Sequence, residues 1–187
     1  VMAVDGDSSF GNGVTVTVMC ETGGREVKIY DELSAHTAYI MAMYRDRKDM
    51  IGRLNAMVDE YSLGRRSSIG RVGQRCVISG CKEIKNVNFG DGSRIENAFR
   101  LKNGTVNSAE TSPSYIGIGV IAENFIVSSD TKITDGVLLF NCFVGQGCEL
   151  GRQYSAENSL FFANCAGFHG EACSIFAGPY TVTHHKS

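Results

Sequence analysis

The sequence predicts an all-β-dominated fold, a parallel β-helix of triangular cross-section interrupted by an inserted two-helix hairpin. Three observations predict it: a recurring glycine motif, an apolar period of six residues, and a central region where helical spacing replaces that period. Glycine is abundant at 22 residues and proline scarce at 2, which suits many tight corners joined by fully paired strands. We expect residues 1–187 to form one β-helix domain.

The recurring motif has an apolar residue first, glycine second and a small residue fifth. Its clearest copy is Val144-Gly145-Gln146-Gly147-Cys148, and the others are Phe10–Val14, Phe89–Ser93, a looser Ile116–Val120 and a partial Val72–Cys76. A glycine loop that binds a dinucleotide phosphate joins a strand to a long helix, and no long helix follows any copy. The glycines are therefore interpreted as the corners of a repeat rather than as a phosphate loop.

The spacing of the copies predicts the length of one coil. Phe89 follows Val72, and Phe162 follows Val144, at a spacing of about 17 to 18 residues, and apolar residues recur every six within a unit. Hexads grouped three to an 18-residue turn are typical of a triangular parallel β-helix. The first and fifth residues of each hexad should point inward, among them Cys76, Cys142 and Cys148.

Longer spacings between copies predict insertions. The intervals from Phe89 to Ile116 and from Ile116 to Val144 each exceed one 18-residue coil by a loop of about 9 or 10 residues. The polar stretch at 107–115 is the first such loop. The interval from Phe10 to Val72 is longer still and accommodates one coil plus a larger insertion.

Residues 31–66 form that larger insertion and predict a helical hairpin. They lack glycine corners and carry apolar side chains at helical spacing, with Asp31 or Ser34 as the first N-cap and Asp46 between the helices. We expect two antiparallel helices that project from one corner of the coil. Their apolar stripes should pack on the coil or on a partner subunit, the second stripe comprising Met50, Ile51, Leu54, Met57, Val58 and Tyr61.

Composition excludes several classes of function. The net charge of -2, from 18 basic and 20 acidic side chains, gives no general attraction to nucleic acid or to an anionic membrane. No apolar run approaches the ~20 residues of a membrane span. Seven cysteines without a Cys-x-x-Cys pair favour free thiols in a reducing cytoplasm, and no cluster of ligands has metal-site spacing.

The candidate catalytic residues lie near the end of the chain. His184 and His185 stand together in the stretch TVTHHKS, where either imidazole could act as a general base and Lys186 could hold a phosphate or carboxylate. The alternative is an exposed, inert pair. His169, in a glycine-punctuated break in the hexads, and Asn164 are the other candidate substrate-binding residues, although each has a purely structural interpretation as well.

The hexads resemble the hexapeptide-repeat superfamily of trimeric left-handed β-helix proteins, which includes acyltransferases and sugar-nucleotide uridylyltransferase/acetyltransferases. More narrowly, a bacterial family of long hexapeptide-repeat proteins, known only as a domain of unknown function, is similar in the segments DGDSSFGNGV, ETGGREVKIYDELSAHTAYIMAMYR, RLKNGTVNS, CFVGQGCELGRQYSAENSLFFANC and GEACSIFAGPYTVTHHKS. The resemblance implies a left-handed coil, a homo-oligomer with a trimer favoured, and a longer parent protein of which this chain is a fragment.

Two functions follow as hypotheses. In the first, the chain is a transferase domain that moves an acyl or nucleotidyl group to a sugar or sugar nucleotide, using acyl-coenzyme A or a nucleotide sugar as co-substrate. The superfamily's acyltransferases place a histidine between subunits to deprotonate the acceptor, and His184 and His185 are the positions here that match such a role. In the second, the chain is a non-catalytic scaffold for oligomerisation or partner binding.

Overall fold

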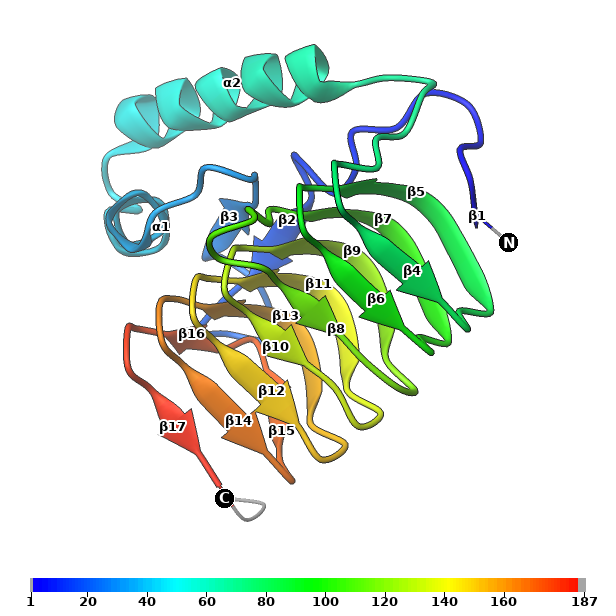
Figure 1. Ribbon diagram of the computed structural model, residues 1–187. Helices are drawn as coiled ribbons and strands as arrows, with labels where there is room; N and C mark the ends of the chain where they lie inside the picture. Colours follow the sequence, from blue (N-terminus) through cyan, green and yellow to red (C-terminus); the bar gives the residue numbers. More distant parts are fainter. Residues whose placement is uncertain (1, 185–187) are drawn as a thin grey trace.

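The computed structural model describes residues 2–184 as a left-handed parallel β-helix of about six coils with two helices along one side (Figure 1). The predicted fold class is therefore confirmed. Five long strands each bend near the middle and so contribute to two faces of the triangle: β5 (Glu83–Phe89), β7 (Arg100–Val106), β9 (Ile121–Val127), β11 (Leu138–Val144) and β13 (Ser155–Phe161).

We call the face formed by the first halves of these strands face 1, and the face formed by their second halves face 2. Shorter strands extend them: β1 (Met2–Ala3) pairs with β5, while β15 (Glu171–Cys173) and β16 (Phe176–Ala177) pair with β13. Face 3 is a separate seven-stranded sheet of β4 (Val77–Ser79), β6 (Arg94–Glu96), β8 (Tyr115–Ile116), β10 (Lys132–Ile133), β12 (Glu149–Gly151), β14 (Ala166–Phe168) and β17 (Val182–Thr183).

The coil is shorter than the hexad pattern predicts. Equivalent asparagines in successive coils, such as Asn124 and Asn141, are 17 residues apart. The strand register agrees, since Leu138 pairs with Ser155. The shortened side is the bend between faces 1 and 2, where a single asparagine turns the chain. Phe161 therefore takes the inward position assigned to Phe162, and Phe162 faces outward against the N-terminal region.

The loop after β7 lengthens its coil less than predicted. The equivalent positions Asn103 and Asn124, on either side of this loop, are 21 residues apart, so the insertion is much shorter than the predicted one. The loop ends before Tyr115, which already belongs to β8. Ile116 aligns with Ile95 and Ile133 on face 3, so its glycine motif is not equivalent to the one that begins at Phe89.

Most corners contain a residue with positive φ, and glycine and asparagine are the commonest residues there. Between faces 1 and 2 the residue is asparagine in five successive coils, with φ of 48° to 55°: Asn86, Asn103, Asn124, Asn141 and Asn158. Asparagine tolerates the left-handed region better than most residues. Four of the side chains form a ladder along the coil axis, with Nδ2 to Oδ1 distances of 2.8, 2.9 and 3.1 Å between neighbours.

The small fifth residue of the motif closes the corner between faces 2 and 3. Thr131 Oγ1 donates to the Gly145 carbonyl at 2.8 Å, and Cys148 Sγ donates to the Phe162 carbonyl at 3.0 Å. Each bond joins one coil to the next, so a small polar side chain is satisfied inside the core. Cys142 and Cys148 are buried as predicted, and burial raises the pKa of Cys142 to about 12, which keeps that thiol neutral.

The N-terminal region that precedes β4 does not add a coil, contrary to the prediction from the Phe10–Val14 motif. The turn at this motif packs on the asparagine ladder, since the Gly11 amide donates to Asn103 Oδ1 at 3.0 Å. An antiparallel hairpin follows, with β2 (Thr15–Thr17) and β3 (Glu26–Lys28). Its buried Val16 and Val27 cover face 2 in a second apolar cluster that includes Ile126, Phe143 and Leu160.

The helices α1 (Ala35–Met43) and α2 (Lys48–Arg65) form the inserted hairpin, and Ser34 is the N-cap of α1, its Oγ accepting the Thr37 amide at 3.1 Å. They pack against the β2–β3 hairpin, which itself covers face 2, rather than project from a corner. Figure 1 views α1 nearly end-on and α2 from the side, so the helices cross instead of running antiparallel. Met50 and Met57 are exposed, so the buried stripe of α2 is narrower than predicted.

Candidate functional site

A groove of about 650 Å³ runs along the corner between faces 2 and 3. One wall is the segment 31–35, where α1 begins. The other consists of corner residues from successive coils, so the groove follows the coil axis. Its floor includes Phe143 and Phe162, whose ring centroids are 5.6 Å apart.

The groove presents mainly uncharged hydrogen-bonding groups. Four serines and two amide side chains line it: Ser34, Ser108, Ser128, Ser129, Asn107 and Gln146. Its charged lining residues are three carboxylates and one guanidinium, Asp31, Glu32, Asp91 and Arg71. Arg71 already pairs with Asp91 at 3.3 Å. The site therefore offers hydroxyl, amide and carboxylate groups above an aromatic floor, and it lacks an excess of positive charge.

Asp31 holds the helical wall in place. Its Oδ1 accepts a hydrogen bond from the Tyr61 hydroxyl at 2.5 Å, and Arg65 Nε lies 3.6 Å from its Oδ2. Its main chain is also fixed, since its amide donates to Asn12 Oδ1 and its carbonyl accepts from Asn107 Nδ2. Residues from α2, the N-terminal turn and the coil thus meet at one residue, which makes the groove wall preorganised.

Replacing Tyr61 by phenylalanine should remove part of the loss of stability at alkaline pH. Burial and the hydrogen bond to Asp31 raise the pKa of Tyr61 to about 12, whereas an unfolded tyrosine ionises near pH 10. The unfolded chain releases this proton first, so stability falls as pH rises from about 10 to about 12. Between about pH 9 and pH 11, the wild type should lose about 1 kcal/mol more than Tyr61→Phe in urea unfolding, or less where solvent screens this partly exposed hydroxyl. Equal losses would show that this hydroxyl is not protected by folding.

The predicted catalytic residues do not lie in the groove so far as the structure describes them. His184 is exposed at the end of β17, and its ring lies 4.9 Å from that of Phe168 on face 3. Pro179 lines the groove from the turn that precedes β17, whereas His184 follows the other end of that strand. His185 and Lys186 lie outside the described residues.

Asn164 and His169 occupy corners of the coil. Asn164 has φ of 59° before β14, and His169 has φ of 54° after it. They stand at opposite ends of that strand, so the structure does not bring them together. Asn164 lies over Gly147, where any side chain would collide with Oδ1 of Asn164. This contact explains the second glycine of the clearest motif.

The groove could not be predicted from the sequence, because its lining residues share no local motif. They come from segments between Asp31 and Pro179, and only the stacking of coils places them side by side. One signal was available: Ser128 and Ser129 follow an apolar strand at the position where other coils turn. Within residues 2–184, no group of three or more histidine, cysteine, aspartate or glutamate side chains could hold a metal ion, and no helix is long and apolar enough to cross a membrane.

The fold and the groove define a class, left-handed parallel β-helix proteins with a helical insertion that walls an axial cleft. Within it, the chain belongs to the family described as Domain of unknown function (DUF4954), whose model matches residues 1–187. An uncharacterized protein of Treponema pallidum (strain Nichols) is 33% identical over 120 residues, covering 64% of this chain and 17% of that relative. The match thus spans less than a fifth of that relative's length. No solved structure matches the chain.

Proposed function

We propose that this domain binds a neutral sugar in the groove, as the acceptor-binding part of a transferase related to the hexapeptide-repeat enzymes. The observation that supports this most is the groove's lining of serine hydroxyls and side-chain amides above Phe143 and Phe162. A sugar offers hydroxyls to the polar groups and an apolar ring face to the exposed apolar lining residues Ala109 and Pro179, since Phe143 and Phe162 are almost fully buried.

Charge favours a neutral ligand over a phosphorylated one. The one arginine among the described lining residues is engaged by Asp91. Asp31 lies 3.6 Å from Arg65, which leaves Glu32 as an additional carboxylate. A nucleotide sugar or acyl-coenzyme A carries several negative charges, which this arrangement repels. We therefore place the sugar acceptor in the groove and assign no donor site to it.

The competing function is a non-catalytic scaffold, and one observation favours it. Among the described residues, those that line the groove include no histidine, lysine or cysteine, the side chains most often used as a base or nucleophile near neutral pH. Under this alternative, the groove would bind a sugar without a reaction, or bind none.

A ligand screen with a blocked-groove variant tests the proposal. Neutral mono- and oligosaccharides should raise the melting temperature of the wild type, whereas acyl-coenzyme A and uridine diphosphate sugars should not. Ser129→Trp should abolish the stabilisation by filling the groove, and Ser79→Trp, on exposed β4 of face 3, is the matched control that should retain it. Stabilisation only by the phosphorylated compounds, or equal binding to Ser129→Trp, would contradict the assignment.

A further inference from the structure

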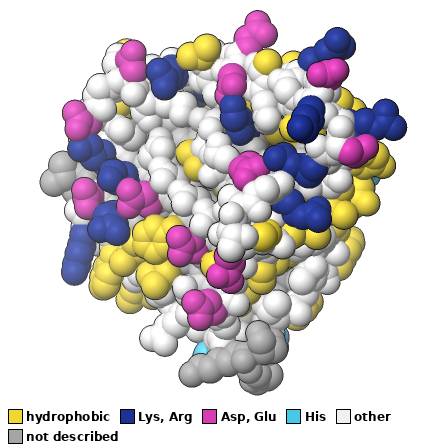
Figure 2. All heavy atoms as spheres, turned by 180° about the vertical axis from the view of Figure 1, so that it is seen from behind, with side chains coloured by type: hydrophobic (Ala, Val, Ile, Leu, Met, Phe, Trp, Pro, Cys, Tyr) yellow, Lys and Arg dark blue, Asp and Glu magenta, His cyan; other side chains and the backbone are white. Residues whose placement is uncertain are grey.

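Face 1 presents an apolar patch where an exposed sheet face usually carries polar side chains. Ile121 lies beside Leu138 in the strand register, and Phe140 lies two residues further along the same strand. All three are half-buried, and they occupy the neighbouring strands β9 and β11. Figure 2, which views the molecule from behind, shows hydrophobic side chains gathered beside charged ones.

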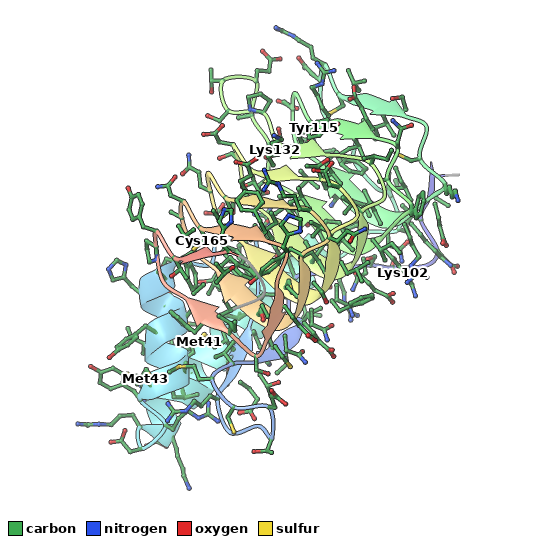
Figure 3. The ribbon with its side chains drawn as sticks, turned by 90° about the horizontal axis from the view of Figure 1, so that it is seen from below. Met41, Met43, Lys102, Tyr115, Lys132 and Cys165 are labelled. Carbon is green, nitrogen blue, oxygen red and sulfur yellow. The ribbon has the colours of Figure 1, made fainter. Side chains whose placement is uncertain are left out.

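The charges on the two sides of this patch differ along the coil axis. Towards the N-terminus, Arg100 and Lys102 of β7 share one carboxylate, Glu123, at 3.9 and 3.0 Å, and Arg100 Nε is buried without a hydrogen-bond partner. Towards the C-terminus, Glu157 of β13 is exposed and makes no ion pair with any described residue. One side thus has a cation in excess, and the other a carboxylate. Figure 3 places Lys102 on a different side of the coil from Tyr115 and Lys132 of face 3.

A two-fold axis that lies in the interface, parallel to the strands and between β9 and β11, would match these two sides. Rotation about this two-fold axis reverses the direction of the coil axis. Because β7 and β13 are equally far from the two-fold axis, β7 of one copy lies over β13 of the other. It keeps the strand direction, so residues at the same position along paired strands meet. Lys102 would then face Glu157 of the second copy, and Ile121 would face its Leu138.

The contact should be limited to the four central strands, from β7 to β13. Beyond them, the same operation places Glu83 of β5 opposite Glu171 of β15, and two carboxylates repel each other. The twist between neighbouring strands also separates two stacked sheets away from the axis. Face 1 therefore offers an Ile121–Leu138 contact at the centre and one complementary ion pair on either side of the axis. Glu123, which would face Phe140 of the second copy, keeps its ion pair with Lys102.

We infer that face 1 binds a second copy of this chain in a two-fold arrangement with antiparallel coil axes. Two requirements of such an isologous interface are met: an apolar contact beside the axis, between Ile121 and Leu138, and opposite charges at equal distances from the axis. The patch is small for a permanent interface, so the dimer should dissociate on dilution. The inference does not depend on sugar binding in the groove.

Charge reversal in complementary pairs tests the register. By sedimentation equilibrium, Lys102→Glu and Glu157→Lys should each raise the dimer dissociation constant at least ~10-fold, because each places two like-charged pairs across the interface. An equimolar mixture of the two variants should recover wild-type association, since in the mixed dimer each reversed side chain meets the other. Glu149→Lys, on face 3, should leave association unchanged.

A second pair of variants keeps the inference testable if the first pair folds poorly. If Lys102→Glu melts at a lower temperature than the wild type, Ile121→Glu with Leu138→Lys repeats the design at the apolar centre. Each variant alone buries unpaired charges, whereas their mixed dimer has one ion pair and one intact apolar contact. A wild-type chain that stays monomeric at all concentrations overturns the inference. So does a trimer, a pair of mixtures that fail to recover association, or a loss of association in Glu149→Lys.

Discussion

Replacing Phe125 by alanine should lower the free energy of unfolding by about 3–5 kcal/mol. The Phe125 side chain is fully buried in the centre of the coil. Its ring fills the space above Gly104 of the preceding coil, so that a methyl group at Gly104 would collide with it. Truncation leaves a cavity between two coils. The coils cannot move together to fill it, because backbone hydrogen bonds hold their spacing on all three faces.

The contact with Gly104 makes this prediction specific. Gly104→Ala alone should cost about 1–3 kcal/mol by overpacking. The double variant should cost less than the sum of the two single variants, because the new methyl group occupies part of the cavity. Urea unfolding of the four proteins gives the coupling free energy directly. Additive effects would show that the ring and residue 104 do not compete for the same space.

Replacing Asn141 by alanine should lower the free energy of unfolding by about 2–4 kcal/mol, which combines a lost hydrogen-bond pair with backbone strain. Asn141 accepts from Asn124 at 2.9 Å and donates to Asn158 at 3.1 Å, in the middle of the ladder. Alanine leaves a donor and an acceptor unpaired on the neighbouring coils. The alanine also has to adopt a φ of 52°. This left-handed conformation is unfavourable for alanine, which has a Cβ atom but lacks the side-chain amide of asparagine.

Asn141→Gly separates the two causes. Glycine removes the same hydrogen bonds but adopts positive φ without strain, so it should be about 1 kcal/mol more stable than the alanine variant. Thermal and urea unfolding of both variants measure the difference. If glycine is as destabilising as alanine, backbone strain does not contribute, and the ladder alone accounts for the asparagines.

Residues whose role is local were predictable from the sequence. Phe89, Ile95 and Leu101 are buried at the six-residue spacing that the pattern gives, and Ser34 is the N-cap of α1. These features depend on side-chain alternation and on capping, which act over a few residues. For the same reason, the apolar period was enough to predict a parallel β-helix.

The candidate site could not be predicted in this way. Its wall at Asp31 meets corners such as Ser128 and Gln146 only after the coils stack and the N-terminal region folds over face 2. The sequence instead predicted His184 and His169 as site residues, because histidines in irregular stretches can be recognised without knowledge of the fold. In the structure these two lie beyond the ends of β17 and β14, away from the groove.

The sequence by itself determined the coil: inward apolar residues, small residues that close one corner, and asparagine at the positive-φ bend between faces 1 and 2. The tertiary structure decided how that coil is used. The coil is shorter than three full hexads because a single asparagine turns the corner between faces 1 and 2. The Phe10–Val14 motif, which has the form of a corner, became a turn that packs on the asparagine ladder instead. The physical reason is that a short glycine motif specifies a local bend, while its surroundings decide which surface that bend covers.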